Sequence, residues 1–213
     1  MKLPRFAPLS GIAFVVLLIV GFGPVGGSTP GSDDSATKIS AFYHDHQTKE
    51  VAAAIIVAVA VIFLAMFVVA LRDYLRGAGG GGDFWPTVAL VGGIVSVGGF
   101  CLAIAIHAAL IDGGHNKLPG AALMALNALD NWDFFTFAFP LTIMLFGVAG
   151  SVLKAGAPLP KWLGWVALVL AILFFAGPFG FLAFLLTGIW IVVASVLMYR
   201  RSAPAAPAPT PTA

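Results

Sequence analysis

The chain has 213 residues, of which 60% are apolar and only 9% are charged. Soluble globular domains average about 45–50% apolar and about 25% charged residues. These values exclude a soluble globule and a disordered chain, and they indicate an integral membrane protein. The formal net charge of +2 comes without a basic stripe, so we predict no nucleic-acid partner. A single cysteine, Cys101, excludes an intrachain disulfide and a cysteine-based metal site.

Six apolar runs are candidates for membrane-spanning helices, each of which requires about 20 mostly apolar residues. They cover residues 9–25, 51–71, 86–111, 134–153, 162–176 and 181–199. The last two come from one uncharged run, which Gly177 and Pro178 divide with a turn. The sequence therefore predicts an all-α, polytopic bundle of six spans over residues 1–201. An Ala- and Pro-rich tail at 202–213 is predicted to be disordered.

The first run also fits a cleaved secretory signal, which would leave five spans and an external amino terminus. Lys2 and Arg5 supply the basic head that a signal requires, and small residues follow the apolar stretch. That stretch is longer than the ~7–15 residues usual in a signal, which favours a retained span.

Lysine and arginine residues are shared unevenly between the two sides of this predicted topology. With the amino terminus inside, the inner side carries Lys2, Arg5, Arg72, Arg76, Lys154, Lys161, Arg200 and Arg201, and the outer side carries Lys38, Lys49 and Lys117. Inner loops of membrane proteins are enriched in these residues, so both termini are predicted to be cytoplasmic. The expected environment is the lipid bilayer of a cell membrane, specifically a bacterial inner membrane.

Residues 34–50 predict an amphipathic helix outside the membrane. One face of it is formed by Ile39, Phe42, Tyr43 and His46, which recur at helical spacing. Glu50 returns to that face four residues after His46, so we expect both side chains to look onto the bundle. The helix should run on into the second span with a bend. A further outer segment, 118–129, is too short to span and is expected at the interface.

His46, Glu50 and His107 form the sharpest candidate site, with Asp112, Asp130 or Asp133 nearby. His46 and Glu50 are spaced i, i+4, which can hold a divalent metal or orient an imidazole. His107 lies within the third span beside a stripe of small residues, and an ionisable residue there is a functional candidate. The favoured alternative is structural: these residues hydrogen-bond the outer helix to the bundle.

Trp190 falls near the middle of the sixth span, where its indole N–H requires a partner. Packing within the bundle is the expected role, and lining a ligand cleft is the alternative. The neighbouring pair His44 and His46 is an unsuitable metal clip, because residues i and i+2 of a helix point about 200° apart.

Two stretches resemble a large group of uncharacterised six-pass bacterial membrane proteins. Leu159-Pro160-Lys161-Trp162-Leu163-Gly164, before the fifth span, is similar to the Leu-Pro-basic-Trp-Leu-Gly segment of that group. Residues 35–46 resemble its first external helix, with His46 as the one polar match. The resemblance extends over nearly the whole chain in span order. It implies a six-helix bundle and no particular activity.

No HExxH, GxSxG, Walker or CxxCH motif occurs, so we predict no cofactor and favour a protein without catalytic activity. The leading hypothesis is a membrane component or accessory subunit, with a membrane protein partner or a second copy of the chain. The alternative is a small-molecule or metal binding protein, or carrier, with an outward-facing site near His46, Glu50 and His107. A membrane enzyme using those residues is the weakest hypothesis.

Overall fold

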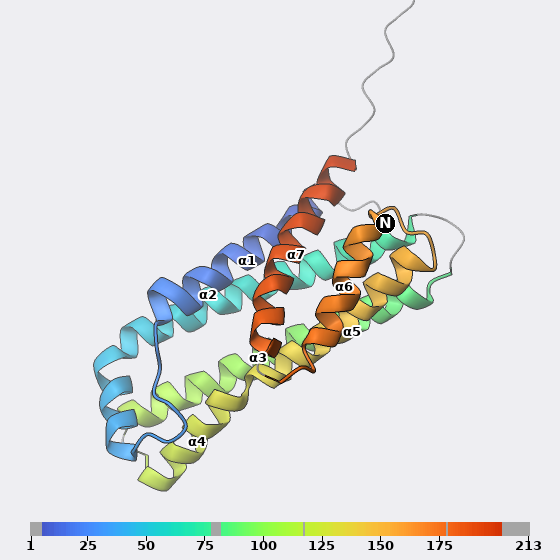
Figure 1. Cartoon of the computed structure of the whole chain (residues 1–213). Coiled ribbons are helices and arrows are strands. Elements are labelled where there is room, and N and C mark those ends of the chain that lie inside the picture. Colours follow the sequence, from blue (N-terminus) through green and yellow to red (C-terminus); the bar gives the residue numbers. More distant parts are fainter. Residues whose placement is uncertain (1–5, 78–81, 117, 178, 202–213) are drawn as a thin grey trace, which may run out of the picture.

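The computed structural model describes residues 6–77, 82–116, 118–177 and 179–201, which are mainly helical and contain no strand (Figure 1). The elements are η1 (Ala7–Leu9), α1 (Ser10–Val20), the π-helical η2 (Gly21–Gly26), α2 (Ala36–Arg76), α3 (Phe84–His115), α4 (Gly120–Trp132), α5 (Phe134–Leu153), α6 (Lys161–Leu173) and α7 (Phe179–Arg201). The predicted tail at 202–213 lies outside the described residues.

Five helical segments are long and apolar enough to cross a membrane, which confirms the all-α membrane bundle. They are Ala7–Gly26, Ala36–Arg76, Phe84–His115, Gly120–Leu153 and Phe179–Arg201. The predicted span at 162–176 is the exception, because α6 has only 13 residues. At 1.5 Å per residue it is about 20 Å long, which is less than the hydrocarbon thickness of about 30 Å. It ends where the chain turns towards Gly177, whose φ of +58° a residue with a Cβ rarely adopts.

The predicted external helix and second span form one element, the 41-residue α2. Ser35 begins it, because its side chain accepts a hydrogen bond from the N–H of Lys38. Asp34 accepts bonds from the Lys38 ammonium and from the N–H of Gly31. These two bonds hold the pKa of Asp34 below its ordinary value.

The outer segment predicted at 118–129 is α4, which leads directly into α5 through Asp133. The bounds of α5, Phe134–Leu153, coincide with the predicted fourth span. Pro140 lies inside α5 and has no N–H to donate to the carbonyl of Thr136.

Helices α3 and α5 touch along a glycine seam, formed by Gly92, Ser96 and Gly99 of α3 against the backbone of α5. A Cβ on Gly99 would collide with the carbonyl oxygen of Thr136, and one on Gly92 would collide with the backbone at Met144. Ser96 donates to the carbonyl of Phe137 at 2.7 Å. Small residues therefore allow the two backbones to meet, as they do in many membrane bundles. The carbonyl that Pro140 leaves without its helical donor faces this seam.

The two ends of the bundle differ in charge, and Figure 1 shows that helices return to each end in turn. The cationic end contains Arg72, Arg76, Lys154, Lys161, Arg200 and Arg201. There Arg76 pairs with Asp83 through two hydrogen bonds, and Arg201 donates to the carbonyl of Pro158. The acidic end contains Asp33, Asp34, Asp45, Glu50, Asp112, Asp130 and Asp133. It comprises the outer part of α2, the end of α3, and α4 (Figure 1).

Candidate functional site

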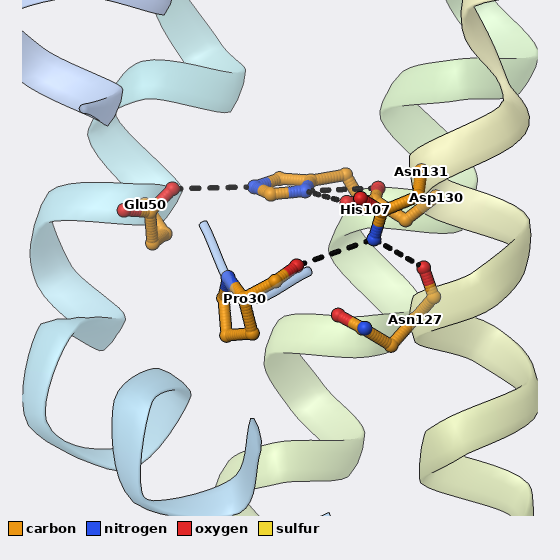
Figure 2. A network of polar contacts seen from close by, with 6 residues as sticks. All are labelled: Pro30, Glu50, His107, Asn127, Asp130 and Asn131. Carbon is orange, nitrogen blue, oxygen red and sulfur yellow. Dashed lines mark hydrogen bonds and ion pairs between the residues drawn. The ribbon is translucent and has the colours of Figure 1, made fainter. Parts of the chain in front are cut away.

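A polar cluster at the acidic end joins three helices through the imidazole of His107 on α3. Its Nδ1 lies 3.0 Å from Oδ1 of Asp130 on α4, and its Nε2 lies 3.3 Å from Oε2 of Glu50 on α2 (Figure 2). When both acids are ionised, both contacts are hydrogen bonds at once only if the ring holds two protons and a positive charge; a neutral ring makes both when one of the acids is protonated and donates. The arrangement is an imidazole held between two acids.

Burial makes this cluster unlike a surface ion pair. The side chains of Glu50, Asp130 and His107 are 2%, 10% and 19% exposed. The second carboxylate oxygen of Glu50, Oε1, is buried and has no hydrogen-bond partner among the described residues. The hydroxyl of Tyr43, whose ring packs edge-on against His107, is likewise buried and unpartnered within the described part of the chain. Buried polar atoms usually have hydrogen-bond partners. Two buried polar atoms without partners beside one cluster therefore indicate that its polar groups do more than hold the helices together.

A cavity of about 520 Å³ extends from this cluster into the bundle. Its polar end is formed by Glu50, His107, Asp130, Asn131 and Asp133. The rest of the wall is mainly apolar and includes the rings of Phe22, Phe100, Phe134, Phe137, Phe181 and Phe184. Pockets that bind small molecules share this size, this apolar wall and this small group of convergent polar side chains.

The connection between η2 and α2 covers the acidic end of the cavity. Gly27 and Thr29 line the cavity directly. The next residues are held by α4, since Asn131 donates to the carbonyl of Pro30 at 3.2 Å (Figure 2) and Asn127 donates to that of Gly31 at 2.8 Å. These two amides hold a short loop between the cavity and the outer surface.

The structure brings together only part of the site predicted from the sequence. Glu50 and His107 meet, but His46 is exposed and does not join them. Its Nδ1 is 2.9 Å from the carbonyl of Phe42, one turn earlier, and its ring stacks on the ring of Phe42. Throughout the described ranges, no group of three His, Cys, Asp or Glu side chains is arranged to hold a metal ion.

Trp190 packs inside the bundle and does not line the cavity. Its Nε1 donates to the carbonyl of Leu163 at 3.1 Å, and 2% of the residue is exposed. The bond ties α7 to α6 and satisfies the indole N–H, which is the packing role expected for it.

Asp130 is the one of the three acids expected near the site that contacts His107 directly. It lies near the end of α4, one turn before α5 begins. The covering amides Asn127 and Asn131 were not anticipated. Their i, i+4 spacing on a helix whose only other polar side chain is that of Asp130 is the signal that points to them.

Comparison of the chain with protein-family models, with curated proteins and with solved structures finds no match in any of the three.

Proposed function

We propose that this integral membrane protein binds a small amphipathic molecule, with its polar head at the cluster and its apolar body in the cavity. The observation that supports this best is the cavity itself. It joins an aromatic, apolar wall to a buried carboxylate oxygen of Glu50 that has no partner among the described residues. A bundle that served only for packing would gain stability by filling about 520 Å³ with side chains.

The depth of the cluster in the membrane favours an amphipathic ligand. Glu50 and Arg72 lie on the same helix, 22 residues apart, which corresponds to about 33 Å. That distance is close to the hydrocarbon thickness of about 30 Å. With Arg72 at one interface, Glu50 lies at the other, and the aromatic part of the cavity lies among the lipid tails. A bound molecule would therefore be oriented as a lipid is.

The rim of the cavity suggests that the ligand arrives from the bilayer. Ile19 and Phe22 on one side, and Phe181 and Leu185 on the other, line the cavity and are also exposed on the outside of the bundle. Large apolar side chains exposed on membrane-spanning helices face lipid. The loop held by Asn127 covers the aqueous side. A molecule already dissolved in the membrane would reach the cavity between α1 and α7.

The glycine seam favours a second candidate function, that of an accessory component that acts through its shape. Close backbone packing between α3 and α5 gives a rigid body suited to docking a membrane protein partner or a second copy of the chain. This hypothesis does not require the cavity, so the occupancy of the cavity distinguishes the two.

The test is to ask what the purified protein retains. The full chain would be extracted into polymer-bounded nanodiscs, and small molecules would be identified by mass spectrometry. Ala103→Phe fills the cavity, and Ala105→Phe adds the same ring to the exposed side of α3. We expect a molecule enriched over bulk lipid in the wild type and Ala105→Phe, and reduced at least tenfold in Ala103→Phe. Equal content in all three would contradict the proposal.

We further propose that the cationic end lies in the cytosol of a bacterial cell and that the site opens on the external side. The distribution of lysine and arginine supports this orientation. Single cysteines at Arg76 and at Asp45, introduced after replacing Cys101, would be labelled in intact cells with a membrane-impermeant maleimide. The cysteine at 45 should react and that at 76 should not. The reverse pattern would overturn the orientation. The resemblance to six-pass bacterial proteins is consistent with this location.

A further inference from the structure

The polar end of the cavity contains more acidic than basic groups. Three carboxyl groups line it, those of Glu50, Asp130 and Asp133, and the described lining residues include His107 but neither lysine nor arginine. With Glu50 and Asp130 ionised and His107 protonated, one negative charge remains in excess, and an ionised Asp133 would add a second. A negatively charged head would meet like charges here, whereas a positively charged head would relieve their repulsion.

Glu50 supplies the acceptor for such a head. The residue is only 1% exposed, and its Oε2 contacts His107 while its Oε1 has no hydrogen-bond partner in the described structure. A buried carboxylate oxygen without a donor is energetically unfavourable. Glu50 lines the cavity, so a small rotation of its carboxyl group would let a protonated amine in the cavity donate to this oxygen beside His107.

The wall next to the cluster suits the same charge. Phe134 and Phe137 line the cavity together with Asp130 and Asp133. The faces of aromatic rings attract alkylammonium groups and repel anions. A bare metal cation is a poorer match, because no set of three ligating side chains converges in the residues described.

We propose that the site selects amphiphiles with a cationic nitrogen head, such as a long-chain alkylamine, over neutral and anionic molecules of the same length. Glu50 Oε1 accepts a hydrogen bond from the ammonium, and Asp130 and Asp133 add negative potential. The chain lies among the phenylalanines. This inference deepens the proposed function and depends on it.

The experiment compares three probes that share one chain length: dodecylamine, dodecanol and dodecanoate. Radiolabelled probe would bind at equilibrium to the full protein in phosphatidylcholine nanodiscs, and empty discs would give the partition background. We expect saturable dodecylamine binding at least tenfold tighter than that of dodecanol, with dodecanoate weakest. Equal binding of dodecylamine and dodecanol would overturn the charge selectivity and leave the amphiphile site standing. Saturable binding of none of the three would overturn both.

The role of Glu50 is tested with Glu50→Gln, which keeps the shape of the side chain and removes its charge. Asp45→Asn is the matched control, because Asp45 is exposed on the same helix and does not line the cavity. The preference for dodecylamine should fall to less than threefold in Glu50→Gln and remain at the wild-type value in Asp45→Asn. Dodecanol binding in Glu50→Gln shows that the cavity is still formed. An undiminished preference in Glu50→Gln would refute the assignment of Glu50.

Discussion

The two halves of α3 differ in what lies opposite their small and polar residues. In the half towards the cationic end, Gly92, Ser96 and Gly99 meet the backbone of α5 with no space between them. In the half towards the acidic end, Ala103 and His107 line a cavity. Residues at one helical spacing thus pack directly against α5 in one half of α3 and line a cavity in the other half.

The difference shows that small residues permit a close approach without causing it. Ala103 continues the helical spacing of Gly92, Ser96 and Gly99, yet it lines the cavity. At the seam, α5 supplies carbonyl groups that fit against glycine, including that of Thr136. Beyond it, the chain of α5 gives way to α4, whose Asp130 reaches His107 through its side chain.

The largest effect is expected at the seam. Gly99→Ala should destabilise the protein by about 3 kcal/mol, because the new methyl group meets a backbone carbonyl that cannot rotate away. Gly98→Ala is the control one residue earlier, since a Cβ there finds no atom within 4 Å, and it should cost nothing. Unfolding by sodium dodecyl sulfate in mixed micelles measures both. Equal stability of the two variants would show that the helices can separate freely.

A smaller loss is expected at the cluster. His107→Ala leaves Glu50 and Asp130 facing each other without the imidazole, which should cost about 2 kcal/mol. His46→Ala removes an exposed ring that bonds only within its own helix and should cost less than about 0.5 kcal/mol. The same unfolding assay applies. If His107→Ala were as stable as His46→Ala, the cluster would not hold α2, α3 and α4 together.

A loss of about 1 kcal/mol is expected for Trp190→Phe, which removes one buried hydrogen bond to α6 and little volume. Trp165→Phe is the comparison on α6, because Trp165 is 58% exposed. Thermal unfolding in detergent should rank Trp190→Phe below both the wild type and Trp165→Phe. A change in dodecylamine binding in Trp190→Phe would contradict the assignment of Trp190 to packing alone.

The smallest effect is expected for Asp34, which precedes α2 and belongs to neither half of α3. Because its pKa is lowered, the stabilisation of the start of α2 is present above its ordinary pKa of 3.8 and is lost as the pH falls through the lowered value. Amide exchange at residues 36–39, corrected for the intrinsic rate, should therefore accelerate in acid. Asp34→Asn should remove this dependence. An identical acid response in that variant would assign it to another group.

The fold was accessible from the sequence to the extent that single helices determine it. Apolar runs located the long helices, and 134–153 matched α5 to the residue. Helical periodicity gave the direction of Glu50 and His107 but not that of His46 relative to them. The contact between Glu50 and His107 depends on how far α2 is displaced along α3, and 57 residues separate these two residues in the sequence. The cavity could not be predicted, because no pattern in the sequence shows where the side chains of neighbouring helices leave the space between them unfilled.

The shortness of α6 has a consequence for the surrounding lipid. Its 13 residues stand beside α5, which has 20, so the apolar perimeter of the protein is uneven. A bilayer next to a short apolar segment thins to avoid exposing its tails. We expect such a dimple along α6 and the start of α7, next to Phe181 and Leu185 at the rim of the cavity. Lipids in a thinned leaflet are less ordered. We therefore expect the thickness of the membrane to affect how readily a molecule enters the cavity.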